Sequence, residues 1–507
     1  MVKKLWEKNK YIILSTLAFG FVAHGMALLN KLSTHDDGIG GGMGTTYTSG
    51  RWMLYIIKKL QLEVIGRSST MSTPLFNGLL SLVFIAVAAC FIIGMLKIKN
   101  KYLQIMLSGL MAVFPVITSL FAYMFTAPYY MLSICAGSFA VWIISQNKRW
   151  YCWLAGGVIL GCCTGIYQAY IPLFVGLCLL ACINEIYTSE DYSLKAAIKT
   201  MLYYGGACVV MLVTYLLLNK LMLDVKHAEL TTYEGISGFG VTSISGYIKR
   251  IILAYKEFFA PTAGAVTDMY PLRARLYYYV ALTAAVIFSA FIALKIYRKS
   301  NSYLFALLEL ALICLIPLAS DFIYVMVDEE SIHSLMTYGD IIAFVYLVWA
   351  ADNMGPVLPK KAACAGTAIV LTLMNLVYLK YDNICYLEAE ILQEESKSYY
   401  TELVARIQST DGYSSDMPVI YLNELNKVTE SPFAAKEFSV VNIAPYGYYY
   451  SINDYSWKST MKMWTGFDPV IGDYGSLGNN EKIGSLTVYP DEGSIAVIDG
   501  NVVVRFA

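Results

Sequence analysis

The sequence predicts an α-helical polytopic membrane protein that ends in a small α+β domain. Hydrophobic residues make up 57% of the 507 residues and charged residues only 15%, and the mean hydropathy is +0.54. This balance is atypical of a soluble domain. Long apolar runs recur up to about residue 380, where the chain turns polar. We therefore expect a membrane domain over residues 1–380 and an extracytoplasmic domain over residues 381–507.

The apolar runs predict about eleven transmembrane helices, although several runs are shorter than the ~20 residues of a perpendicular span. The expected spans are residues 11–29, 75–96, 102–124, 129–144, 152–167, 170–183, 201–218, 277–294, 303–318, 335–350 and 362–379. No internal repeat is visible among them, which argues against the inverted-repeat folds of many transporters.

The basic residues predict the orientation, because lysine and arginine in short connections mark the cytoplasmic side. They precede the first run and then occupy every second connection, at residues 97–101, 148–149, 195–199, 295–299 and 360–361. The connections near residues 126 and 168 and at 319–334 carry none. This alternation predicts a multi-pass plasma-membrane protein with a cytoplasmic N-terminus and an uncleaved first span. The loop after that span, the loop 219–276 and the C-terminal domain then face outward.

The polar C-terminal part is expected to begin with a helix at about 383–409 and to continue into short strands. The expected strands are residues 419–422, 438–441, 486–488, 495–498 and 502–506. Asp499-Gly500-Asn501 joins the last two, a turn typical of a hairpin.

Composition also limits the chemistry. Ten of the eleven cysteines lie in or beside apolar runs, where a thiol acts as a small hydrophobic group. No cysteine or histidine spacing resembles a zinc site, and a net charge of zero argues against nucleic acid as a partner. We expect no cofactor, while a divalent metal held by paired carboxylates stays open.

The main candidate for catalysis is His35-Asp36-Asp37, which follows the first expected span. A carboxylate at headgroup depth could act as a general base on a hydroxyl. Alternatively, Asp36 caps the next segment and Asp37 is merely solvated. Five glycines within residues 38–44 would let the backbone approach a ligand closely, although flexible loops are glycine-rich as well.

Gly50-Arg51-Trp52 opens a second candidate segment. Apolar residues at Trp52, Ile56 and Leu60 predict a short helix in the membrane interface. Arg51 could grip a phosphate through two hydrogen bonds, or it could anchor the helix to lipid headgroups. A similar interfacial pattern occupies residues 247–259.

Further polar residues lie near the expected outer face. Arg273 and Arg275 precede the eighth run and could hold a lipid-linked phosphate or act as a topological anchor. Gln168 lies at the tip of the Gly165-Ile166-Tyr167-Gln168-Ala169-Tyr170 hairpin. It could bind a sugar hydroxyl beside the Tyr167 ring, or it could only stabilise the turn.

Four other titratable residues lie next to or within apolar runs. Asp321, His333 and Asp340 flank the ninth and tenth runs, and Glu309 lies within the ninth. An acid inside a span is a functional hypothesis by default, although Glu309 could equally pair with a neighbouring helix.

The chain resembles the Gtr-type glucosyltransferases. The resemblance lies in the order of its features along the sequence: the acidic pair, Gly50-Arg51-Trp52, the hairpin at 165–170 and about eleven spans. These polytopic enzymes glucosylate O-antigen and other bacterial cell-surface glycans, such as cell wall polysaccharides, and belong to the C-type glycosyltransferase (GT-C) superfamily. The resemblance covers the membrane portion, roughly residues 1–380.

The resemblance implies transfer of a sugar, glucose in this family, from a polyprenyl-phosphate carrier to a glycan hydroxyl on the outer face, with inversion. Asp36 or Asp37 would be the base, with His35 beside it, and Arg51 would bind the departing phosphate. Gln168 or Tyr167 would orient the sugar. The expected partners are thus the lipid-linked donor, the glycan acceptor and the bilayer.

The alternative from another class is a transporter, such as a flippase of lipid-linked saccharides. It would explain the spans and Glu309, but it has little use for large outer loops or a soluble tail. Other sugar transferases and polymerases of surface polysaccharide stay open within the enzyme class.

Overall fold

The computed structural model describes residues 2–32, 37, 46–66, 72–231, 243–262, 270–271, 273–355, 358–423, 456–477 and 480–506. The chain forms two compact units. The first consists of Met1–Asn30 with Met43–Ile384, and the second of Lys31–Gly42 with Cys385–Ala507. Each is described by itself.

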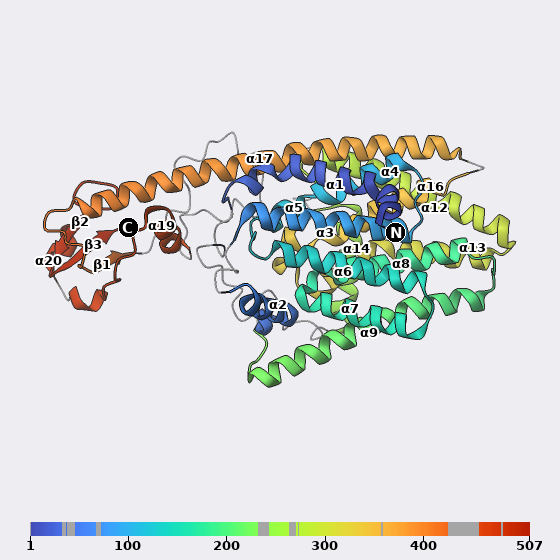
Figure 1. Cartoon of the computed structure of the whole chain (residues 1–507), viewed down its shortest axis with the longest axis horizontal. Coiled ribbons are helices and arrows are strands. Elements are labelled where there is room, and N and C mark those ends of the chain that lie inside the picture. The colour runs from blue at the N-terminus through green and yellow to red at the C-terminus, as the bar shows by residue number, and fades with distance from the viewer. Residues whose placement is uncertain are drawn as a thin grey trace. The chain divides into compact units, whose positions relative to one another are not determined.

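The first unit is helical (Figure 1). Its longer helices are α1 (Val2–Leu29), α3 (Pro74–Met95), α4 (Lys101–Val113), α6 (Ala127–Gln146), α7 (Trp150–Ile166), α8 (Ile171–Thr188), α9 (Leu194–Lys226), α12 (Ala274–Ser300), α13 (Tyr303–Cys314), α16 (Ile341–Asp352) and the start of α17 (Lys360–Gln408). Shorter elements are α2 (Trp52–Val64), α5 (Pro115–Phe121), α10 (Ile244–Phe259), α14 (Ile316–Ser320), α15 (Ile323–Met326) and the 3-10 turns η1 (Thr46–Ser49), η3 (Gln168–Tyr170), η5 (Glu329–Ser331), η6 (Ser334–Met336) and η7 (Tyr338–Asp340).

Prolines and short polar side chains begin many of these helices. Proline occupies the first turn of α3, α5, α6, α8 and α14, where its missing N–H costs nothing. Asn100 accepts hydrogen bonds from the first backbone N–H groups of α4, and Ser193 and Ser243 cap α9 and α10 in the same way. Pro115 divides the expected span 102–124 into α4 and α5, because a proline cannot continue the hydrogen-bond ladder.

Helices occupy all eleven expected spans, but they differ in length. Within the described ranges, nine helical stretches are long and apolar enough to cross a membrane, and α7 is a shorter apolar helix. The expected span 335–350 consists of η6, η7 and the 12-residue α16. The nine long stretches are what a polytopic membrane protein requires.

Close packing in the first unit depends on small residues. Helix α1 packs against α3 and α4, and α6 lies between α3 and α7 (Figure 1). A Cβ atom on Gly78 of α3 would approach a Leu28 side-chain carbon of α1 to 2.7 Å, so only glycine permits this contact.

Buried polar groups pair across helices: His24 of α1 bonds to the Ala112 carbonyl at 2.8 Å, and Thr118 donates to Asp382 at 2.8 Å.

The second unit contains a three-stranded sheet in the order β1-β3-β2. β1 (Val419–Leu422) runs parallel to β3 (Asn501–Arg505), and β2 (Ile495–Ile498) runs antiparallel to it. Positive φ angles at Asp499 and Gly500 form the turn between β2 and β3. Helices α19 (Trp457–Thr465) and α20 (Glu481–Ser485) and the turn η10 (Tyr474–Leu477) complete the described part.

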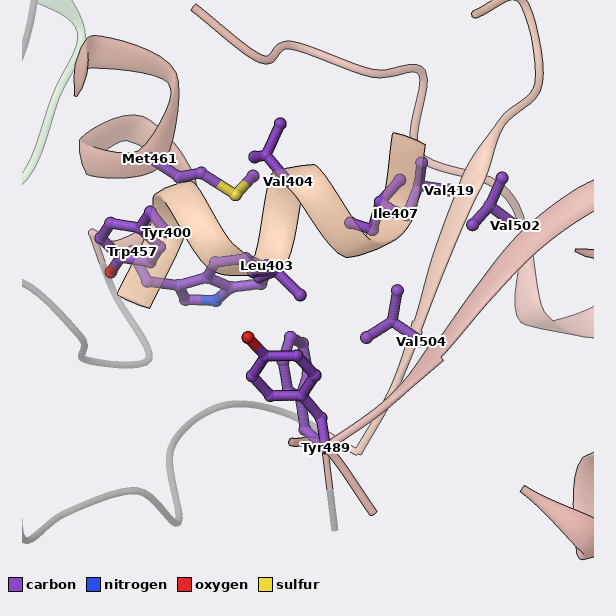
Figure 2. Packing of buried hydrophobic residues seen from close by; sticks show 11 residues of the cluster. Tyr400, Leu403, Val404, Ile407, Val419, Trp457, Met461, Tyr489, Val502 and Val504 are labelled. Carbon is purple, nitrogen blue, oxygen red and sulfur yellow. The ribbon is translucent and has the colours of Figure 1, made fainter. Parts of the chain in front are cut away.

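The end of α17 supplies one side of this unit's core. Tyr400, Leu403, Val404 and Ile407 are spaced i, i+3, i+4 and i+7 and lie on one face of the helix. Figure 2 shows them in one cluster with side chains of the strands β1 and β3, of helix α19 and of the turn at Tyr489: Val419, Trp457, Met461, Tyr489, Val502 and Val504.

Two expectations for this region come out differently, and a third is not tested. The polar helix is not separate, since α17 continues without a break from the last apolar run to Gln408. The expected strand 486–488 is wrong, because the Thr487 N–H bonds to Gly493 within a local turn instead of to a neighbouring strand. The expected strand 438–441 lies outside the described residues.

Candidate functional site

The two motifs that the sequence singles out, Gly50-Arg51-Trp52 and the hairpin at 165–170, meet in the first unit. Gly50 follows η1, Arg51 precedes α2 and Trp52 begins it. The hairpin consists of the last residues of α7 and the turn η3. Each residue of the triplet contacts one hairpin residue, although more than a hundred positions separate the two segments.

Gly50 lies against Gln168. Its φ of +74° belongs to the left-handed region that favours glycine. A Cβ atom there would lie 2.6 Å from the Tyr215 hydroxyl and even closer to the Gln168 amide nitrogen. That nitrogen donates to the Ser49 carbonyl at 2.8 Å and to the Tyr215 hydroxyl at 3.1 Å. The absence of a side chain at position 50 therefore lets Gln168 bridge the first loop and helix α9.

Arg51 lies over Tyr167. Its guanidinium carbon is 5.1 Å from the centre of the Tyr167 ring, and its Nη1 donates to the Tyr130 hydroxyl at 3.2 Å. Tyr130 and Tyr167 stack at 4.5 Å. The guanidinium thus contacts one aromatic ring and one phenol hydroxyl, and its planar fork of N–H groups is suited to binding an anion.

Trp52 packs on Gly165. A Cβ atom on Gly165 would approach the Trp52 ring to 2.5 Å, so the indole, only 3% exposed, lies flush against the end of α7. Leu54 of α2 is buried as well, whereas Ile56 and Leu60, one and two turns after Trp52, are exposed at 39% and 60%. Trp52 therefore fixes one end of α2, while the exposed positions suit contact with a membrane surface.

A cavity of about 230 Å³ opens beside these contacts. Arg51, Tyr167 and Gln168 line one side of it, and its other walls come from α9, α15 and η6. Asn219 of α9 also lines it and is 6% exposed, and no donor in the described part of the chain reaches its Oδ1. Sequence reasoning missed Asn219, whose only signal was a polar residue directly after an apolar run.

The acidic pair belongs in part to the second unit. Asp37 is fully buried, and the Lys31 Nζ lies 3.3 Å from its Oδ2 and donates to its carbonyl oxygen at 2.5 Å. Gln393 of α17 donates to the Lys31 carbonyl. Burial lowers the pKa of Lys31, while the charge of Asp37 opposes that shift. Asp36 and His35 lie outside the described residues.

A second group of carboxyls is buried in the first unit. Asp321, which follows α14, and Asp340, at the end of η7, are 1% and 3% exposed. Apart from the carboxyl of Asp321, no donor among the described residues reaches the carboxylate oxygens of Asp340. Burial, together with the neighbouring carboxyl of Asp340, raises the pKa of Asp321 well above its usual range. This group was visible in the sequence only as two acids flanking apolar runs.

Arg273 and Arg275 lie apart from this cavity, at the start of α12. Arg273 precedes the helix and is exposed, and Arg275 is half-buried in its first turn. The Arg273 carbonyl accepts a hydrogen bond from the Tyr277 N–H, and the side chain of neither arginine makes a hydrogen bond or ion pair with another residue that the structure describes. Of the predicted site residues, the structure thus brings together Arg51, Tyr167 and Gln168, but not the two later arginines.

Comparison with known families identifies the chain. A model of the family described as Glucosyl transferase GtrII matches residues 25–344, more than half of the sequence. The chain belongs to the GtrII family. The family predicted from the sequence is therefore confirmed, and with it the coarse function of a glycosyltransferase with membrane-spanning helices. No curated protein and no solved structure matches the chain.

The GtrII match contains the Gly50-Arg51-Trp52 segment, the hairpin at 165–170 and both later arginines, and it ends within α16. A search of the described ranges for three or more His, Cys, Asp or Glu residues that could hold a metal ion finds none. Helix α17 and the second unit's sheet lie beyond the match.

Proposed function

We propose that this GtrII-family chain transfers a sugar, glucose by its family, from a polyprenyl-phosphate carrier to a hydroxyl of a cell-surface glycan. The reaction would take place on the outer face of the plasma membrane, with the N-terminus in the cytoplasm and the second unit outside, as the distribution of basic residues predicts. The observation that carries the proposal is the meeting of Arg51, Tyr167 and Gln168 at one cavity.

The proposed chemistry is a single displacement with inversion. The acceptor oxygen forms a bond to the anomeric carbon while the bond from that carbon to the phosphate oxygen breaks, and the electron pair leaves with the phosphate. Asp36 or Asp37 accepts the acceptor's hydroxyl proton. The leaving phosphate is already stable as an anion, so a base and one cation are sufficient.

Arg51 is proposed to receive the negative charge that develops on the phosphate. Its planar guanidinium can form two parallel hydrogen bonds to phosphate oxygens. It donates to the Tyr130 hydroxyl, lies over the Tyr167 ring and lines the cavity. Gln168 and Tyr167 are proposed to orient the sugar: an amide can bind hydroxyls, and an aromatic face can cover the apolar side of a sugar ring.

The experiment is transfer of labelled sugar from a panel of synthetic polyprenyl-phosphate sugars by membranes containing the full chain. We expect product from the wild type, and a large loss for Arg51→Gln and for one of Asp36→Asn and Asp37→Asn. Glu63→Gln, at an exposed carboxylate on α2, is the matched control and should leave transfer unchanged. Transfer that survives both aspartate substitutions would contradict the proposed base.

The same membranes separate transfer from transport. A transferase consumes the lipid-linked donor and forms a new glycosidic bond, whereas a flippase moves the donor across a sealed vesicle without changing it covalently. Donor that crosses the membrane intact, with no glycoside formed in the presence of cell-envelope acceptors, would refute the proposal. Running the assay with and without EDTA tests for a divalent metal.

A further inference from the structure

Helix α9 supplies polar side chains to the cavity of about 230 Å³ beside Gln168. Tyr215 and Asn219 are four residues apart on α9, so they lie on one face of the helix, and both line the cavity. The Tyr215 hydroxyl accepts a hydrogen bond from the Gln168 Nε2 at 3.1 Å, and that nitrogen also donates to the Ser49 carbonyl at 2.8 Å. Since an amide nitrogen has two N–H groups, Gln168 can offer a ligand only its amide oxygen.

The amide oxygen of Asn219 is buried without a hydrogen-bond donor. The residue is 6% exposed, and within the described ranges no donor reaches its Oδ1. An unpaired buried acceptor costs free energy, so buried polar groups normally have a partner. A ligand in the cavity that carries a hydroxyl group would supply the missing donor.

Asn184 of α8 shows the ordinary arrangement of a buried asparagine. It is buried to a similar degree, 8% exposed, but its Oδ1 accepts a hydrogen bond from the Trp349 Nε1 at 2.9 Å. Replacing Asn184 would leave that indole N–H without its acceptor. Replacing Asn219 would orphan no donor among the residues that the structure describes. The two asparagines are therefore matched in burial and opposite in pairing.

Much of the remaining lining of the cavity is apolar. Ile323, Met326 and Val327 of α15 and Met336 of η6 contribute to it. A cavity that combines a few amide groups with aliphatic side chains suits a sugar ring, which carries hydroxyls at its edge and C–H groups on its faces.

We propose that the Oδ1 of Asn219 accepts a hydrogen bond from one hydroxyl of the donor sugar, and that Asn219 thereby selects which sugar is transferred. The inference rests on the proposed function, because it takes the ligand to be the sugar of a lipid-linked donor. Arg51 lines the same cavity and is proposed to bind the phosphate to which that sugar is attached. The donor sugar, rather than the acceptor glycan, is therefore the sugar assigned to Asn219. An analogue without the hydroxyl would leave the oxygen unpaired, and such analogues are strongly disfavoured by sites of this kind.

The first test is the thermal stability of the full chain in lipid nanodiscs without substrate. Asn219→Leu removes an unpaired oxygen and nearly keeps the size of the side chain, so the variant should melt at or above the wild-type temperature. Asn184→Leu is the matched control and should melt at a lower temperature, because it leaves the Trp349 N–H unpaired. If Asn219→Leu melts as low as Asn184→Leu, or does not fold, Asn219 serves the fold and the inference is refuted.

The second test compares kcat/KM for polyprenyl-phosphate glucose with kcat/KM for its 2-, 3-, 4- and 6-deoxy analogues. Each ratio measures the preference of the enzyme for one hydroxyl. In Asn219→Leu one of these preferences should fall by about tenfold, the value of one hydrogen bond, while the others stay at wild-type levels. Asn184→Leu should keep them all. A wild type that transfers every deoxy sugar as efficiently as glucose would refute the inference without any variant.

The outcomes separate the two proposals. Absence of wild-type transfer from every polyprenyl-phosphate sugar would refute the proposed function. Wild-type transfer in which Asn219→Leu leaves all the preferences unchanged would refute the role of Asn219 and leave the proposed function standing. A variant that changes the preference only among deoxy acceptors would place the acceptor glycan against Asn219 and overturn its assignment to the donor.

Discussion

Gly50→Ala should disrupt the contact between the first loop and the hairpin at 165–170. Alanine at a left-handed φ costs about 1–2 kcal/mol. The added Cβ, 2.6 Å from the Tyr215 hydroxyl and closer still to the Gln168 amide, must also displace Gln168. Each hydrogen bond that Gln168 then loses, to Ser49 or to Tyr215, costs about 1 kcal/mol. Together these terms lower the stability of the local contact by about 2–4 kcal/mol.

Amide hydrogen exchange of the loop measures this loss directly. The Arg51 N–H bonds to the Thr46 carbonyl at 3.0 Å, and it exchanges when the loop opens. At 1.4 kcal/mol for each tenfold change, about 2–4 kcal/mol corresponds to exchange about 30- to 700-fold faster. Sugar transfer should fall by at least about tenfold, because small displacements of positioning groups are costly in catalysis.

Gly66→Ala is the matched control. Gly66 also has a positive φ, +103°, but a Cβ atom there would meet no atom of the described residues within 4 Å. The Gly66→Ala substitution should therefore strain the backbone only at the end of α2. Sugar transfer and hydrogen exchange of the Arg51 N–H should stay at wild-type levels. Equal effects from the two substitutions, or a Gly50→Ala enzyme that exchanges like the wild type, would refute the role assigned to Gln168.

Three further results are expected. Arg51→Lys should lower kcat/KM for the donor about 10- to 100-fold, because lysine keeps the charge but loses the planar fork and the contact with Tyr167; wild-type kinetics would show that charge alone suffices. The contribution of Asp321 to the thermal stability of the full chain in nanodiscs should be greatest below the ordinary carboxyl pKa of about 4 and should be lost as pH rises through the raised pKa of Asp321, because the folded protein favours its neutral form. Asp321→Asn should flatten that profile, and a profile unchanged by the substitution would contradict the assignment. Leu403→Ala, at a fully buried position, should destabilise the second unit by about 2–5 kcal/mol and speed its limited proteolysis; unchanged proteolysis would show that the cluster in Figure 2 contributes little.

Periodicity and composition predicted most of the fold because the signals are local. Each expected span contains a helix, and the prolines and polar caps that begin helices can be read from the sequence. The break at Pro115 was equally readable, since proline excludes a continuous ladder there. The continuity of α17 could not be predicted from the sequence. Its composition changes near residue 380, but a change of environment from lipid to water does not by itself end a helix.

The candidate site was predictable only in parts. Gly50-Arg51-Trp52 and the hairpin at 165–170 each drew attention by residue type, yet nothing in a single sequence shows that they touch. Their contact depends on how α2 packs against α7, which is a tertiary choice. Asn219 was missed as a site residue, and Asp321 and Asp340 were named only as acids flanking apolar runs, for the same reason: their burial follows from packing between helices far apart in the chain.

The placement of Asp37 links the proposed base to the part of the chain beyond the family match. Within the second unit, Gln393 of α17 holds the backbone of Lys31, and Lys31 in turn contacts both the carbonyl and the carboxylate of Asp37. Gln393 is 5% exposed, so this contact is shielded from water and is correspondingly well defined. The matched family region ends at residue 344, before α17 begins. If Asp37 is the base, its position depends on a helix that begins beyond the family match.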